Sequence, residues 1–171
     1  MDITTKNFPN RKHPRMKYFD YSSNGNYFVT ICTHNRIKTL STIVDDGVVL
    51  TKFGEIVKKE LLNLENKYDF LKIENYVIMP NHIHVLFLFK HDENKESAGA
   101  EQPALHNNHL LQDVVARFKS ISTKEINKEY HYGKIFQTSF YEHVITDEKD
   151  WSNTWDYIDN NPRTWNIDEL Y

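Results

Sequence analysis

The chain has 171 residues, of which 39% are hydrophobic and 26% charged, and its formal net charge is −3. This length and composition exclude a disordered chain and suit one globular domain, which we expect to occupy residues 1–171. No apolar run is long enough to span a bilayer, and the N-terminus lacks the apolar core of a secretory signal. Cys32 is the only cysteine, so we expect no internal disulfide and a location in the reducing cytoplasm.

The N-terminal segment, residues 1–20, is expected to form an extended basic arm. It contains Arg11, Lys12, Arg15 and Lys17. Such an arm is compatible with a polyanionic partner. Because the chain as a whole is not basic, charge alone favours a solvated tail.

The first half of the chain after this arm is rich in predicted strands. β-Branched and aromatic residues predict a strand over residues 27–33 and two short strands around an Asp-Gly turn within residues 42–50. Apolar spacing predicts a helix over residues 51–67. Two further strands are expected over residues 72–79 and 82–90. Only a short Pro-Asn connection separates them, so they should be antiparallel neighbours.

The second half is predominantly helical. Residues 91–108 are mostly polar and predict a flexible loop. Apolar residues at helical spacing predict a helix over residues 110–121 and beyond. Residues 134–139 form either a short strand or an ordered loop, and residues 147–160 form a last helix, which the following Asn-Pro pair ends.

The order of these elements predicts an α+β fold. Strands and helices are mixed, yet the close strand pair has no crossover between its members. We expect a ferredoxin-like antiparallel sheet with helices packed on one face. The last helix should pack through Trp151, Trp155 and Ile158, which share one helical face.

Two histidines interrupt an apolar strand in the stretch YVIMPNHIHVLFLF, residues 76–89. Side chains two residues apart in a strand share a face, so His82 and His84 should lie side by side, where they can reach one divalent cation. A hydrogen-bonded polar core is the alternative. A metal would need a third ligand, for which His143 and the polar residues of the last helix are candidates. On that helix Tyr157 and Asn161 share a face beside the apolar stripe.

Three separated motifs resemble one protein family. MPNHIH, FYEHVI and YIDNNP, together with the opening RKHPRMKYFDYSSNGNYFVTICTHNR, resemble the single-tyrosine HUH transposases, in which HUH denotes histidine, a hydrophobic residue and histidine. This family comprises single-strand insertion-sequence transposases and the REP-associated tyrosine transposases. The resemblance covers nearly the whole chain, from about residue 11 to residue 165.

The resemblance implies a fold, a site and an activity. It implies an α+β fold with the HUH pair on a central strand, and it assigns Tyr157 as the nucleophile. It also implies that His82, His84 and Asn161 hold one divalent metal, Mg²⁺ or Mn²⁺. The implied enzyme is a metal-dependent transposase or nuclease that cleaves and rejoins single-stranded DNA, near a hairpin, through a covalent 5′-phosphotyrosine.

Several alternatives stay open at this point. Tyr141 in FYEHVI could be taken for the nucleophile, but we prefer Tyr157 because an amide follows it at i+4; His143 is expected to support the site. The chain could instead be a domesticated protein that binds DNA or RNA hairpins without cleaving them. It could also be a metal-dependent phosphodiesterase that uses water. Relatives include monomers and dimers, so a homodimer is conceivable.

The resemblance leaves the DNA-contacting residues to be inferred. The chain stops soon after YIDNNP, so we expect no added C-terminal DNA-binding extension. The expected phosphate contacts are therefore the basic arm and one face of the helix that begins at residue 110. On that face lie Arg117, Lys119 and Lys124.

Overall fold

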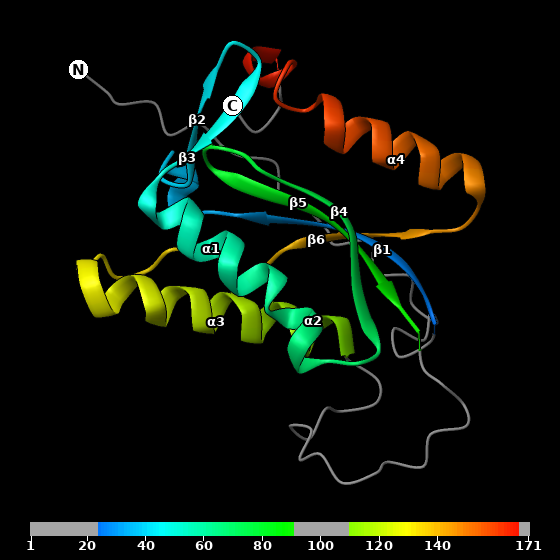
Figure 1. Cartoon of the computed structure of the whole chain (residues 1–171), viewed down its shortest axis with the longest axis horizontal. Coiled ribbons are helices and arrows are strands. Elements are labelled where there is room, and N and C mark those ends of the chain that lie inside the picture. Colours follow the sequence, from blue (N-terminus) through cyan, green and yellow to red (C-terminus); the bar gives the residue numbers. More distant parts are fainter. Residues whose placement is uncertain (1–23, 91–109, 168–171) are drawn as a thin grey trace, which may run out of the picture.

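A four-stranded antiparallel sheet is the centre of the fold (Figure 1). We analysed a computed structural model, which describes residues 24–90 and 110–167; the basic arm with Arg11, Lys12, Arg15 and Lys17 and the predicted loop at 91–108 lie outside the described residues. The strand order is β4-β5-β1-β6. These strands are β1 (Gly25–Cys32), β4 (Leu71–Ile78), β5 (His82–Phe89) and β6 (Tyr141–Ile145).

The described helices follow in the order α1 to α4. They are α1 (Lys52–Leu62), α2 (Leu64–Lys67), α3 (Leu110–Tyr130) and α4 (Glu148–Asn160), with short 3₁₀ turns at His34–Arg36 and Trp165–Ile167. The sequence β1-α1-β4-β5-α3-β6 with this strand order is the ferredoxin-like arrangement. The predicted fold class is therefore confirmed, and the strand that carries the histidine pair, β5, lies inside the sheet. None of the described helices is long and apolar enough to cross a membrane.

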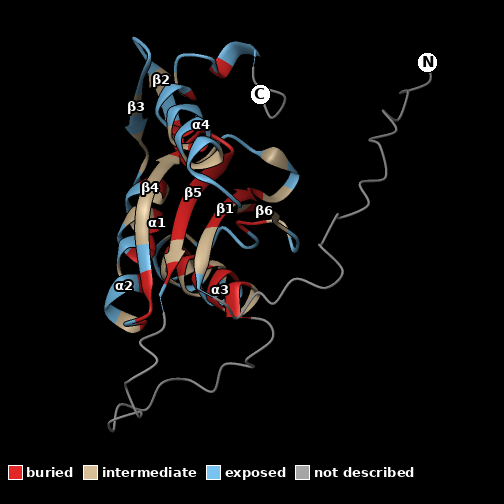
Figure 2. Ribbon diagram, turned by 90° about the vertical axis from the view of Figure 1, so that its right-hand side faces the viewer, coloured by how far each residue is buried: buried red, intermediate tan, exposed pale blue. Residues whose placement is uncertain are grey.

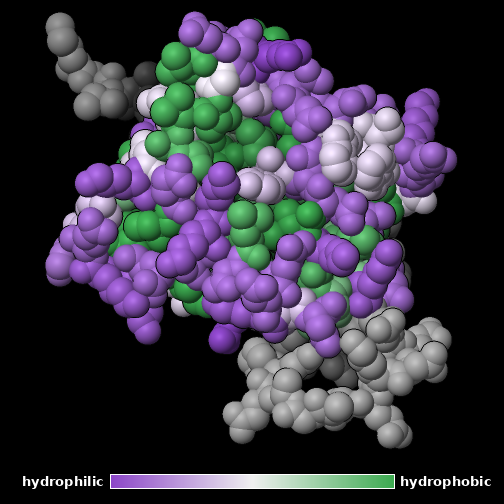
Figure 3. All heavy atoms as spheres, viewed as in Figure 1, coloured by the Kyte–Doolittle hydropathy of each residue, from purple (hydrophilic) through white to green (hydrophobic). Residues whose placement is uncertain are grey.

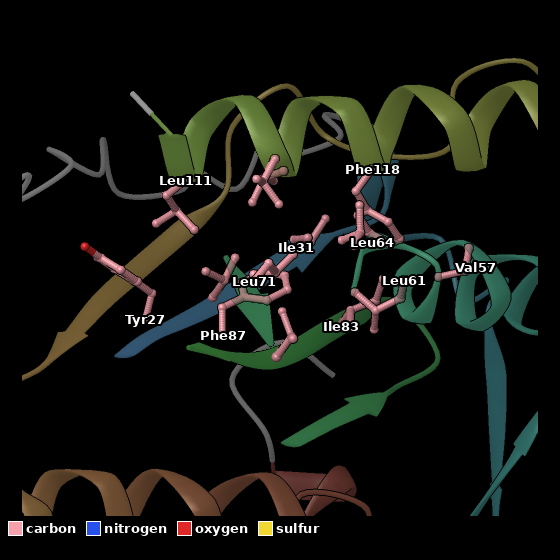
Figure 4. Close-up of a cluster of buried hydrophobic side chains, with 14 of the residues drawn as sticks. Tyr27, Ile31, Val57, Leu61, Leu64, Leu71, Ile83, Phe87, Leu111 and Phe118 are labelled. Atoms are coloured by element: carbon pink, nitrogen blue, oxygen red, sulfur yellow. The ribbon is translucent and has the colours of Figure 1, made fainter. Parts of the chain in front are cut away.

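The hydrophobic core lies between the sheet and the helix pair α1 and α3 (Figure 4). Alternate residues of β5, from Ile83 to Phe89, point into this core, and β1 contributes Tyr27, Val29 and Ile31. Figure 2 shows the resulting band of buried residues along β5. Because side chains alternate along a strand, the histidines of β5 must face the opposite side of the sheet.

Helix α4 covers that opposite side (Figure 1). The expectation of helices on one face only was therefore wrong. The physical reason is that α1 and α3 already bury the apolar face of the sheet, whereas α4 covers the face that carries His82 and His84. The appended helix thus approaches the polar side chains of the two central strands.

The structure decides two segments for which short strands were considered. Residues 134–139, expected as either a short strand or an ordered loop, form a loop: Phe136 makes one isolated bridge to Thr33, and the edge strand is β6, directly after this segment. The hairpin of β2 (Ser41–Val44) and β3 (Gly47–Leu50) turns at Asp45 and Asp46, so Gly47 already belongs to the second strand. Aspartate tolerates the positive φ angles, 49° and 60°, that this turn requires.

The predicted helix over residues 51–67 forms two helices. Thr51 caps α1 by accepting a hydrogen bond from Gly54 N, as expected for a threonine at a helix start. The helix ends at Leu62, and α2 follows after Asn63.

Exposed hydrophobic side chains gather near the β2–β3 hairpin, where Val44 and Val49 are each about half exposed (Figure 3).

Candidate active site

His82 and His84 lie side by side on the α4 side of the sheet. Their ring centroids are 4.5 Å apart, and both side chains are buried. They pair across the sheet with Cys32 and Thr30 of β1. The prediction that the histidines share one strand face is therefore confirmed.

Each imidazole is held through its Nδ1 atom. Nδ1 of His82 lies 2.8 Å from Oδ1 of Asn81, and Nδ1 of His84 lies 2.8 Å from the Thr30 hydroxyl oxygen. An amide oxygen only accepts hydrogen bonds, so Nδ1 of His82 carries the proton and Nε2 carries the lone pair. Such hydrogen bonds fix the tautomer and orientation of metal-binding histidines.

Burial and the neighbouring imidazole keep His84 neutral. Desolvation holds the pKa of His84 well below its ordinary value, and the charge of His82 would lower it further. A neutral imidazole presents a nitrogen lone pair, whereas a protonated one does not. The ring of His84 is therefore in the state that a metal ligand requires.

Tyr157 reaches this pair from α4. Its hydroxyl oxygen lies 3.4 Å from Nε2 of His84, and the two ring centroids are 5.1 Å apart. The side chain is 46% exposed, so solvent can reach the phenol. The structure thus brings together the helix tyrosine and the strand histidine that the sequence separates by 73 positions.

Sequence reasoning missed four residues that surround the pair: Phe28, Thr30, Asn81 and Trp165. Phe28 stacks on His84 with a centroid distance of 5.2 Å, and its ring meets that of Tyr157 edge-on at 5.9 Å. Trp165 lies 5.9 Å from the ring of His82. The alternation of β1 could have identified Phe28, because Tyr27 and Val29 beside it belong to the opposite, core-facing side.

Besides the contact of Tyr157 with His84, two polar contacts near its ends hold α4 to the sheet. Near its start, His143 of β6 contacts Asp150 with 2.9 Å between Nε2 and Oδ2. Near its end, Asn75 of β4 donates a 2.8 Å hydrogen bond to Asp159. His143, predicted to support the site, therefore contacts the helix that carries Tyr157.

The packed face of α4 differs from the predicted one. Thr154 and Ile158 are the buried residues within the helix, while Trp151 and Trp155 are half-buried and lie 4.8 Å apart, centroid to centroid. The small Thr154 lets the helix lie close to the strands, and the larger indoles pack on each other at its flank. This rotation brings Tyr157 and Asn161 nearer the sheet than the predicted tryptophan face would.

Asn161 lies directly after α4 and is buried. Its amide oxygen and two imidazole nitrogens would make a mixed set of donors, of a chemistry that fits Mn²⁺ or Mg²⁺ together with phosphate or water oxygens. Among the described residues no group of three or more His, Cys, Asp or Glu side chains could hold a metal. A metal at this place would therefore depend on the amide as well as on the two histidines.

Tyr141 lies on the second strand from the histidine pair. On β6 it pairs with Thr30 of β1, and Thr30 in turn pairs with His84 of β5. Neighbouring strands are about 4.8 Å apart, so the Tyr141 backbone is about 10 Å from that of His84. The 3.4 Å approach of its hydroxyl oxygen to Nε2 of His84 favours Tyr157 as the residue beside the pair.

The basic residues predicted on α3 are not beside the site. Helix α3 packs on the other face of the sheet (Figure 1), where Arg117 and Lys124 are exposed. Lys119 donates hydrogen bonds to three backbone carbonyls of residues 137–139, the shortest at 2.7 Å. Burial lowers the pKa of Lys119, and the nearby Lys134 adds to the effect. This lysine holds the segment that leads into β6.

The sequence of this chain is similar to those of two known proteins. No protein-family model matches the sequence. An uncharacterized protein of Haemophilus influenzae is 30% identical over 167 residues, which cover 94% of this chain and 93% of that protein. A putative REP-associated tyrosine transposase of the same organism is 28% identical over 153 residues, covering 84% of this chain and 73% of that protein.

The fold recurs in a solved structure. A REP-associated tyrosine transposase bound to a REP hairpin matches with a TM-score of 0.56 and 19% identity, over 87% of this chain and 73% of that one. The sequence relative and the solved structure are both REP-associated tyrosine transposases, so the resemblance that the three motifs indicate is confirmed.

Proposed function

We propose that this protein is a transposase-type enzyme that cleaves and rejoins single-stranded DNA next to a hairpin. One observation carries the proposal: the hydroxyl oxygen of Tyr157 lies 3.4 Å from Nε2 of His84, beside a second buried histidine. A half-exposed phenol next to two buried imidazoles supports attack on a phosphodiester. The hairpin is proposed because a structural relative is described as bound to a REP hairpin.

In the proposed reaction Tyr157 is the nucleophile. Its phenol oxygen forms a bond to phosphorus while the bond from phosphorus to the 3′ oxygen breaks. The phenol proton passes to solvent, and the departing 3′ oxygen takes up a proton. The products are a 5′-phosphotyrosine and a free 3′-hydroxyl, and reversal of the same step rejoins the strand.

We propose His82, His84 and Asn161 as the residues that hold a divalent metal. When bound, Mg²⁺ or Mn²⁺ would supply positive charge that polarises the scissile phosphate. The protein residues orient the site: Asn81 and Thr30 hold the imidazoles through Nδ1, and α4 presents the phenol. The covering helix also restricts water at the buried histidines.

The direct test is whether a covalent protein–DNA adduct forms, which a denaturing gel shows as a shifted band. Labelled single-stranded DNA with a hairpin is incubated with the protein and Mn²⁺ or Mg²⁺ and then run on a denaturing gel. We expect a band of protein-linked DNA that is absent after Tyr157→Phe, a change that keeps the ring and removes only the oxygen. Hairpin binding without a covalent band would contradict the proposal and identify a non-cleaving binding protein. Cleavage without the band would indicate water as the nucleophile.

A further inference from the structure

Phe28 contacts both partners of the proposed reaction site. Its ring lies almost parallel to that of His84, with an interplanar angle of 27° and a centroid distance of 5.2 Å. It meets the ring of Tyr157 at 89° and 5.9 Å. A single side chain of β1 thus lies against the strand histidine and against the helix tyrosine.

The stacked contact restricts His84. The hydrogen bond between Nδ1 and the Thr30 hydroxyl holds the imidazole at one atom, but one such bond leaves the ring able to tilt about its bond to Cβ. An aromatic ring packed on one face of the imidazole opposes that tilt. Phe28 therefore helps to keep Nε2 directed at the Tyr157 hydroxyl.

The edge-on contact restricts Tyr157. Nearly half of this side chain is exposed, so burial alone does not select one rotamer for it. Edge-to-face contact between aromatic rings stabilises a particular arrangement by about 0.5–1.5 kcal/mol. The rotamer that meets Phe28 is also the one that places the hydroxyl 3.4 Å from His84.

We propose that Phe28 is a positioning residue that sets the phenol of Tyr157 and the imidazole of His84 in one geometry. This inference rests on the proposed function and names a residue that neither the HUH motif nor the tyrosine motif contains. Phe28 itself does not touch the reacting atoms. Its role is to keep Tyr157 and His84 in the arrangement from which attack can occur.

The test compares Phe28→Leu with a matched control. Phe53→Leu makes the same change at another half-buried phenylalanine, which contacts Tyr130 and Tyr132 and lies on α1, on the other side of the sheet. At saturating DNA, the rate of covalent band formation should fall between about tenfold and about a hundredfold for Phe28→Leu. The DNA concentration for half-maximal rate should not change, and Phe53→Leu should keep the full rate. Phe28→Tyr, which keeps the ring, should restore most of the rate.

A second readout separates this inference from the proposed function. Incorporated 3-fluorotyrosine gives a fluorine resonance for residue 157, assigned by its loss in Tyr157→Phe. Phe28→Leu should move it toward the value of an exposed tyrosine, and Phe53→Leu should leave it in place. An unmoved resonance, or equal rates for wild type and Phe28→Leu, would overturn the inference. A wild-type protein without any covalent band would refute the proposed function, while the resonance still decides whether Phe28 positions Tyr157.

Discussion

Truncation of Ile158 to alanine should loosen α4 and leave the rest of the fold intact. Ile158 is 1% exposed and is the only apolar residue fully buried within α4, whereas α3 buries six apolar residues in the core. Replacing a buried isoleucine by alanine lowers the free energy of unfolding by about 2–5 kcal/mol. For Ile158, which packs on the outer face of the sheet, we expect the lower value of about 2 kcal/mol. That loss corresponds to about a 30-fold rise in the opening equilibrium of the helix.

Hydrogen exchange measures this opening directly. Backbone amides of α4 should exchange faster than those of α3 in the wild type, because few buried contacts hold α4. Ile158→Ala should raise the rate of amide hydrogen exchange in α4 by about 30-fold and leave the rate in α3 unchanged. Leu111→Ala in α3 is the control, since it removes a fully buried side chain from the core and should accelerate α3. If Ile158→Ala raises the exchange rates of α4 and α3 by the same factor, α4 does not open separately and the reasoning is refuted.

Three further predictions concern the metal, the fold and the DNA. Removal of the metal by chelation, or His82→Ala, should abolish cleavage without loss of the folded circular dichroism spectrum; an unchanged cleavage rate would show that these residues hold no essential metal. Lys119→Met should lower the free energy of unfolding in urea by about 1–3 kcal/mol because three carbonyls lose a charged donor, whereas the exposed Lys124→Met should not. Affinity for hairpin DNA should fall steeply with salt and after deletion of residues 1–17; a flat salt dependence would exclude phosphate contacts as the main source of binding.

The central strand and the fold class could be predicted because local patterns determine them. The period of two in residues 82–89 places the histidines on one face, and a short connection makes β4 and β5 antiparallel. The last helix was also predictable. Asp147 caps its first turn, and an Asn-Pro pair follows its last residue.

The side of the sheet that α4 covers depends on contacts distant in sequence. The sequence predicted helices on one face of the sheet, and the stripe of Trp151, Trp155 and Ile158 suggested the packed face of the last helix. Only the register between β1 and β5 shows that Phe28, Thr30 and His84 form a separate surface for this helix. The pattern did contain a hint, since Tyr157 could meet His84 only on the side opposite to Ile83.

The role of Lys119 could not be predicted for the same reason. Helical spacing places it on the polar face of α3 with Arg117 and Lys124, which suggested a surface for phosphate. Its carbonyl partners belong to the segment before β6, about 20 residues later, and sequence periodicity does not describe that approach. The edge strand was missed likewise, because residues 141–145 are short and only partly apolar.

The most direct test of the account is to identify the tyrosine that becomes linked to DNA. Trypsin should release residues 150–163, which contain Tyr157 as their only tyrosine, and residues 135–149, which contain only Tyr141. After reaction with hairpin DNA and nuclease trimming, mass spectrometry should find the added nucleotide on the peptide of residues 150–163. A nucleotide on the peptide of residues 135–149, with residues 150–163 unmodified, would contradict the assignment of Tyr157 as the nucleophile.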